Sequence, residues 1–151
     1  MTEIRPLRYS AILGAETASA LLAEYSAECS IPEIGQPNPQ ADLYEKMESS
    51  GLMHCLGAFE GSALVGFAAI LFYIVPHYGK KIASVESLFV AQSHRSGGTG
   101  ETLMQTIESE AKSNGCAVIL YSAPTGSQLE RVLSLRKDCR RTNSVFTRNL
   151  Q

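Results

Sequence analysis

The residues with the clearest chemical use in this sequence form a glycine-rich stretch, Arg95-Ser96-Gly97-Gly98-Thr99-Gly100. It lies between an apolar, β-branched run that ends at Val90 and a helical pattern that follows Gly100. The first backbone N–H groups of a helix have no partners within the helix and carry partial positive charge. Glycine has no side chain, so a ligand can approach these groups closely. The stretch therefore predicts a site for a phosphate or pyrophosphate group, where Arg95 could add a charged contact.

Two common phosphate-binding motifs do not fit this stretch. The nucleoside-triphosphate loop requires a lysine after its last glycine, and here Glu101 follows Gly100. The dinucleotide-binding motif requires a third glycine or alanine at the position of Leu103. A glycine-rich connection also needs no ligand, so a plain turn between strand and helix stays open. Nucleotide binding without acyl chemistry is a third alternative.

The pattern Arg95-x-x-Gly98-x-Gly100, preceded by Glu86-Ser87-Leu88-Phe89-Val90, resembles the central motif of the GNAT superfamily of acyl-CoA-dependent N-acyltransferases. The resemblance implies acetyl-CoA as co-substrate, with its pyrophosphate on the glycine-rich loop and its pantetheine arm paired with the strand backbone. It implies transfer of the acetyl group to an amine by direct attack in a ternary complex. The coenzyme-binding residues that it implies are Leu88, Phe89, Val90, Arg95, Ser96, Gly97, Gly98, Thr99 and Gly100.

Glu86 is the best candidate for the general base, and in many GNAT members a glutamate in this strand has that role. An ammonium group must lose a proton before it can attack a thioester. Glu86 stands in an otherwise apolar strand, so the sequence predicts a buried carboxylate that is a stronger base than one in water. The alternatives are a carboxylate that faces solvent, or one that pairs with Lys80 or Lys81.

Two positions depart from the family pattern. Many members have a tyrosine in the helix after the fifth strand, which protonates the leaving thiolate, and the matching position here is Ser134 or Leu135. Ser134 is the catalytic candidate, although a serine hydroxyl is a poor acid. Water, Tyr121 or no donor at all are the alternatives. Glu101 repels a pyrophosphate modestly. These departures favour the runner-up function, a GNAT-like domain that binds acyl-CoA as a sensor or partner-binding module but catalyses weakly.

Composition argues against several other classes of protein. Thirteen basic and fifteen acidic side chains give a formal charge of −2, whereas nucleic-acid binding calls for a concentrated basic surface. The four cysteines and three histidines make no metal-ligand spacing, so no metal is expected. No apolar run is long enough to cross a membrane, and the first ten residues lack a signal-peptide core. We expect a cytoplasmic protein of one domain, residues 1–151.

Apolar periodicity and turn residues place these motifs on strands and helices in the order β-α-α-β-β-β-α-β-α-β. This order predicts an α/β (α+β) fold, similar to the GNAT layout, with a central mixed sheet flanked by helices. The run 63–74 is too apolar for a strand with one wet face, so it is expected at the centre. The resemblance places the first two helices beside the acceptor pocket, and the acceptor itself stays open. A homodimer through the last strand is a further hypothesis. Strands are expected at Ile4–Tyr9, Leu52–Phe59, Ala63–Ile74, Ser84–Val90, Cys116–Ser122 and Thr142–Leu150. Helices are expected at Ala15–Glu28, Ala41–Ser49, from the glycine-rich loop to Asn114, and at Gln128–Lys137.

Overall fold

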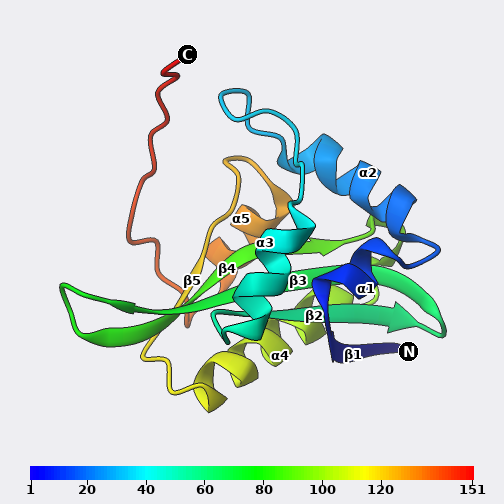
Figure 1. Cartoon of the computed structure of the whole chain (residues 1–151), viewed down its shortest axis with the longest axis horizontal. Helices are drawn as coiled ribbons and strands as arrows, with labels where there is room; N and C mark the ends of the chain where they lie inside the picture. Colours follow the sequence, from blue (N-terminus) through cyan, green and yellow to red (C-terminus); the bar gives the residue numbers. More distant parts are fainter.

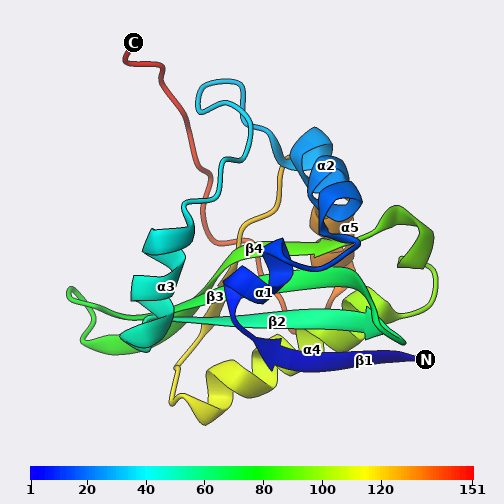
Figure 2. The same ribbon diagram turned by 45° about the vertical axis from the view of Figure 1, so that its right-hand side comes forward.

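The sheet at the centre of the molecule has five strands and carries helices on both faces (Figures 1 and 2). The computed structural model describes all residues from Met1 to Gln151. The strands are β1 (Thr2–Leu7), β2 (Met53–Glu60), β3 (Ala63–Val75), β4 (Lys80–Val90) and β5 (Ile119–Tyr121). The helices are α1 (Tyr9–Leu13), α2 (Ala18–Cys29), α3 (Ala41–Ser49), α4 (Thr99–Ser113) and α5 (Gln128–Leu135), with a 3₁₀ turn at Gln92–His94.

The strands follow chain order across the sheet, β1-β2-β3-β4-β5. The first four are antiparallel to their neighbours, and β5 runs parallel to β4, so the predicted mixed sheet is confirmed. The parallel pair arises because α4 carries the chain back along the sheet before β5 begins. The predicted central strand is confirmed as β3, and eight of its residues are buried. Because β3 is covered on both faces, its side chains do not alternate between polar and apolar.

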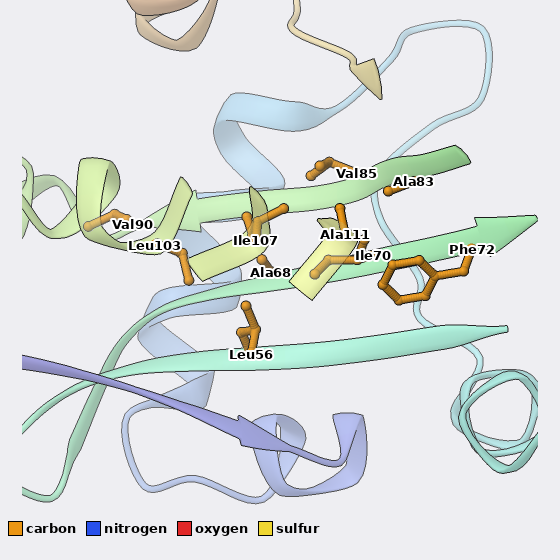
Figure 3. Packing of buried hydrophobic residues seen from close by; sticks show 10 residues of the cluster. All are labelled: Leu56, Ala68, Ile70, Phe72, Ala83, Val85, Val90, Leu103, Ile107 and Ala111. Atoms are coloured by element: carbon orange, nitrogen blue, oxygen red, sulfur yellow. The ribbon is translucent and has the colours of Figure 1, made fainter. Parts of the chain in front are cut away.

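Each face of the sheet has its own hydrophobic core. On one face, α4 packs through Leu103, Ile107 and Ala111 against alternate residues of β2, β3 and β4 (Figure 3). On the other face, Ile12 of α1 and Leu21 of α2 pack against the sheet residues that point away from α4. Figure 2 shows α1, α2 and α3 on the side opposite α4. No helix of the structure is both long and apolar enough to cross a membrane.

The predicted terminal strand Thr142–Leu150 is wrong. Residues 136–151 form no regular secondary structure, and this tail extends away from the sheet in Figure 1. Val145, Phe146 and Leu150 are 85%, 91% and 87% exposed. The segment has strand-forming residues, but such residues form a strand only where a neighbouring strand pairs with them. The edge strand β5 is three residues long, which is too short for a stable hydrogen-bond ladder with the tail.

Several predicted boundaries also differ from the observed elements. The short helix α1 occupies Tyr9–Leu13, where the end of a strand and a loop were predicted, so three helices precede β2. The predicted strand Cys116–Ser122 shortens to β5, and the last predicted helix ends at Leu135. The observed order is therefore β-α-α-α-β-β-β-α-β-α.

Candidate active site

The glycine-rich loop presents a row of unpaired backbone donors at the start of α4. The N–H groups of six consecutive residues, Ser96 to Glu101, donate to no acceptor in the chain. The first helical bond runs from the Thr102 N–H to the Gly98 carbonyl, at 3.0 Å. Gly98 makes the turn because its φ of +80° is a conformation that side chains disfavour. This arrangement can bind an anionic group of two phosphates.

A pocket of about 350 Å³ adjoins this loop. Thr99 is buried at its floor, and its hydroxyl shares a hydrogen bond of 2.9 Å with the hydroxyl of Thr2, which ties α4 to β1. On the pocket wall, the His94 ring is held between Ser93 Oγ at 2.8 Å and Glu60 Oε2 at 2.9 Å. The pocket is lined by Met1, Thr2, Glu60, Ser93, His94, Ser96, Gly97 and Thr99.

Arg95 is engaged by protein groups at the entrance to the loop. Its Nε donates to the Val90 carbonyl at 2.8 Å, and one Nη donates to both carboxylate oxygens of Glu28 at 2.9 Å. The guanidinium also lies 5.1 Å from the centre of the Phe89 ring. Arg95 therefore joins the end of β4, the end of α2 and the loop, and its phosphate contact remains a prediction.

Glu86 occupies a β-bulge in β4. Ala69 of β3 pairs with Ser87 and Ile70 pairs with Val85, so Glu86 is the extra residue of β4 at this point. A bulge interrupts the ladder and turns a side chain in a direction that a regular strand would not give. The predicted burial of Glu86 is wrong, because the bulge exposes its side chain. The pairing alternative also fails, since Glu86 makes no ion pair and the ammonium of Lys81 lies over the Phe72 ring.

One tyrosine contacts the Glu86 carboxylate, and two more belong to the same hydrophobic cluster. The Tyr44 hydroxyl donates to Oε1 at 3.3 Å, and its ring stacks on Tyr9 with 3.6 Å between the ring centres. Tyr25 packs edge-on against Phe89 from α2. Burial raises the pKa of Tyr9 to about 12. It also raises the pKa values of Tyr25 and Tyr44, and the charge of Glu86 is the next cause in both. All three phenols therefore stay neutral at physiological pH.

The β4 backbone has an open edge beyond the bulge. β5 pairs with β4 only at Ala83, Ser84 and Val85, so the two strands separate after that point. The Ala91 N–H donates to β3 at the Val65 carbonyl, and backbone groups of a strand alternate in direction. Leu88 and Val90 therefore present their backbone groups to the open edge.

The same alternation corrects the predicted role of Phe89. Its backbone faces Phe67 of β3, and its side chain is 4% exposed within the core. Phe89 is therefore a core residue. The backbone groups free to pair with a ligand are those of Leu88 and the N–H of Val90, because the Val90 carbonyl accepts from Arg95. Beside Glu86, the Ser87 hydroxyl is buried and has no hydrogen-bond partner.

The predicted proton donor Ser134 is exposed on α5 and makes no side-chain hydrogen bond. The alternative donor, Tyr121, has its hydroxyl hydrogen-bonded to Glu108 Oε1 at 3.1 Å, and burial raises its pKa. No group of histidine, cysteine or carboxylate side chains has the arrangement of a metal site. Neither Ser134 nor Tyr121 contacts Glu86.

The tyrosines Tyr9, Tyr25 and Tyr44 were not singled out from the sequence. Tyr9 and Tyr25 have the periodicity of core residues, and both do pack on the core. Tyr44 gave the better signal, since it is an aromatic residue in a helix whose neighbours are mostly charged. Only the fold shows that α3 brings this residue to β4.

Several solved structures of other proteins are similar to this chain. A ribosomal-protein-alanine N-acetyltransferase from Brucella melitensis biovar Abortus 2308 has a TM-score of 0.69 at 20% identity, covering 97% of this chain and 99% of that one. An aminoglycoside acetyltransferase from an uncultured soil metagenomic sample, in complex with sisomicin, has a TM-score of 0.75 at 14% identity, covering 99% and 97%. An acetyltransferase of Trypanosoma brucei has a TM-score of 0.64 at 17% identity, covering 97% and 100%. At such identities these likenesses show a shared fold.

Comparison of the sequence with models of protein families shows to which family the chain belongs. No curated protein sequence matches this chain. The sequence model of the acetyltransferase (GNAT) family matches residues 19–132, which run from α2 into α5 and include the bulge, the open edge of β4 and the glycine-rich loop. The chain belongs to the GNAT family of acetyltransferases, which use acetyl-CoA as co-substrate.

Proposed function

We propose that this protein transfers an acetyl group from acetyl-CoA to a primary amine by direct attack, without an acetylated enzyme intermediate. One observation carries the proposal: the six free N–H groups of Ser96 to Glu101, the open edge of β4 and the exposed Glu86 follow one another along a single path. The first two features suit a pyrophosphate and an extended amide chain. Glu86 stands four residues before Val90, about 13 Å along the strand.

In this proposal the coenzyme lies along the loop and the strand. The N–H groups of Ser96, Gly97, Gly98, Thr99 and Gly100 hold the pyrophosphate, and the Leu88 carbonyl and the Val90 N–H pair with the pantetheine amides. Arg95 fixes the loop through Val90 and Glu28, and its charge also favours the phosphates. Glu101 opposes them modestly from the first helical turn.

The proposed reaction requires one proton transfer before bond formation. Glu86 takes a proton from the acceptor ammonium, directly or through a water molecule. The neutral nitrogen then attacks the thioester carbon, and the negative charge that develops on oxygen is stabilised by a backbone N–H of the open edge, for which Leu88 is the candidate. The carbon–sulfur bond breaks, the nitrogen loses its second proton as the amide forms, and the coenzyme leaves as a thiolate. The thiolate takes up a proton from Ser134 or water, and the proton released by the nitrogen restores that donor.

The charge of the acceptor side favours a cationic amine. Residues 16–48, which form α2, α3 and their connection, carry seven acidic side chains and one basic side chain. Of the seven, only Glu28 makes an ion pair. Such a surface raises the local concentration of cations and repels anions. Because Tyr44 of α3 reaches Glu86, this charge acts where the acceptor must bind.

A second candidate function is acyl-CoA binding with weak or no turnover, as in a sensor or partner-binding module. The exposure of Ser134 and the engagement of Tyr121 by Glu108 favour it, since an exposed serine hydroxyl and a phenol that already donates to a carboxylate are both poor acids for the thiolate. A homodimer is also proposed, through the tail residues Val145, Phe146 and Leu150, which are almost fully exposed. Sedimentation of the protein as a monomer would contradict the dimer.

The test of the coenzyme site is acetyl-CoA titration by calorimetry on the native protein and two tryptophan variants. Gly98 and Gly115 have similar φ values, +80° and +72°, and both have open space where a side chain would begin. Gly98→Trp fills the loop at the start of α4, whereas Gly115→Trp introduces the same strain beyond the other end of that helix. We expect the first to abolish binding and the second to retain it.

Transfer is then measured as release of free coenzyme thiol with butylamine and with putrescine. Binding together with transfer supports the enzyme, and binding without transfer to either amine supports the sensor. No binding by the native protein up to about millimolar acetyl-CoA, a limit of roughly −4 kcal/mol, would refute both functions. The glycine-rich loop would then be only a turn.

A further inference from the structure

The Glu86 carboxylate is held by one side chain from a different element. Tyr44 of α3 is the only side chain that donates a hydrogen bond to it, to Oε1 at 3.3 Å. No lysine, arginine or histidine pairs with Glu86, so nothing else fixes the direction of the carboxylate through charge.

The backbone does not fix that direction either. Glu86 is the bulged residue of β4, outside the regular ladder, and its side chain is exposed. A free glutamate side chain samples many rotamers, and holding it in one of them costs conformational entropy. A general base works only within hydrogen-bond reach of the proton that it removes. A fixed donor on the carboxylate therefore reduces the number of unproductive orientations.

Tyr44 is itself well fixed. Its ring stacks on Tyr9 with 3.6 Å between centres and 13° between planes, and Tyr9 is 2% exposed. The Tyr9 N–H donates to Glu48 Oε1 at 2.9 Å, and Glu48 lies one helical turn after Tyr44 on α3. α1 and α3 thus hold each other through a ring stack and a hydrogen bond, and the Tyr44 hydroxyl projects from this junction to β4.

We propose that Tyr44 is a positioning residue, which holds the Glu86 carboxylate in the orientation that accepts the proton of the acceptor amine. This role rests on the proposed function, because it acts through Glu86 as the base. The proton moves from the ammonium nitrogen to the oxygen of Glu86, and Tyr44 keeps its own proton throughout. Burial and the charge of Glu86 raise the pKa of Tyr44, which is consistent with a phenol that stays neutral and donates.

The test is a double-mutant cycle on the full chain with putrescine as acceptor. Tyr44→Phe keeps the ring and its stack on Tyr9 but removes the hydroxyl. We expect kcat to fall about tenfold, the effect of losing one hydrogen bond to a charged group, while KM for acetyl-CoA is unchanged. In the Glu86→Gln background, the same Tyr44→Phe change is expected to lower kcat no further. Tyr73→Phe, a change on β3 at a tyrosine that is 39% exposed, serves as the matched control and is expected to leave kcat unchanged.

The two proposals fail in different ways. If Tyr44→Phe lowers kcat by the same factor in both backgrounds, or does not lower it at all, the positioning role is wrong and the proposed function stands. If Glu86→Gln transfers acetyl groups as fast as the native protein, Glu86 is not the base and the role of Tyr44 falls with it. If the native protein transfers no acetyl group to putrescine or butylamine, the proposed function is refuted as well. Unfolding midpoints within error of the native value show that each variant is folded.

Discussion

Glu86 is accessible because it is the single extra residue of a bulge in β4. In a regular strand its side chain would alternate with those of Val85 and Ser87, and one face of this strand packs on the α4 core. The bulge instead exposes the carboxylate and leaves the neighbouring Ser87 hydroxyl buried without a partner. One irregularity therefore accounts for both the exposed acid and the unsatisfied hydroxyl.

Replacing Ser87 by alanine is expected to stabilise the protein. A buried hydroxyl without a partner costs roughly 1–3 kcal/mol, and the smaller apolar methyl group avoids this cost. We expect the free energy of unfolding to rise by about 1 kcal/mol, measured by urea denaturation. Ser84→Ala, three residues earlier in β4, is the control and should change little. A clear loss of stability in Ser87→Ala would show that the hydroxyl has a partner, such as a bound water.

At the scale of elements, the active site depends on how closely β3 approaches β4. Gly66 pairs with Val90, and a Cβ at Gly66 would lie 2.8 Å from the Phe89 carbonyl oxygen. A backbone atom cannot move away without moving its strand, so β4 would shift at the open edge that presents Leu88 and Val90. α5 and the tail constrain the site less, because α5 contributes no buried residue.

Gly66→Ala is therefore expected to lower both stability and coenzyme affinity. Overpacking of this kind costs about 1–3 kcal/mol in the free energy of unfolding. Gly14→Ala is the matched control, since its nearest neighbour, the Ser10 carbonyl oxygen, is 3.4 Å away and φ is −88°. Urea denaturation and acetyl-CoA titration measure the two effects. Unchanged affinity in a destabilised Gly66→Ala protein would mean that the open edge of β4 does not hold the coenzyme.

For the whole molecule, the net charge of −2 conceals an uneven distribution. Residues 1–135 carry fourteen acidic and eight basic side chains, whereas the tail 136–151 carries one acidic and five basic side chains. Half of the acidic residues before the tail belong to residues 16–48, on the side proposed for the acceptor. That side therefore has a local excess of acidic residues although the protein is almost neutral.

Charge reversal on α3 is expected to reduce turnover of a diamine more than that of a monoamine. We expect Glu45→Lys to lower kcat/KM for putrescine several-fold at low salt and to affect butylamine less, because putrescine carries a second positive charge. Glu3→Lys on β1 makes the same change of charge away from α3 and is the control. The difference should shrink as salt is raised to about 150 mM, where charges are screened beyond roughly 8 Å. Equal effects of both reversals, or none of either, would show that the acidic surface does not select the acceptor.

The sequence alone was sufficient to predict the strand before the glycine-rich loop, the loop itself and α4, because each depends on local chemistry. Apolar periodicity marks the buried faces of β3 and α4, and glycine at Gly98 supplies a backbone angle that few other residues adopt. The motif Arg95-x-x-Gly98-x-Gly100 after β4 resembles the central motif of the GNAT family, and the family comparison confirms that prediction. The predicted coenzyme and base residues remain predictions, apart from the corrections at Phe89 and Glu86.

Only the tertiary structure decided the features that depend on pairing between distant segments. The bulge at Glu86 is a mismatch in register between β3 and β4, and neither strand contains that information by itself. Tyr44 reaches Glu86, forty-two residues further along the chain, because α3 packs against α1 and β2. The tail has the residues of a strand but no ladder partner, so its local preference does not produce one. Local preferences are encoded in short stretches, whereas register, long-range contacts and edge pairing are set by the free energy of the assembled sheet.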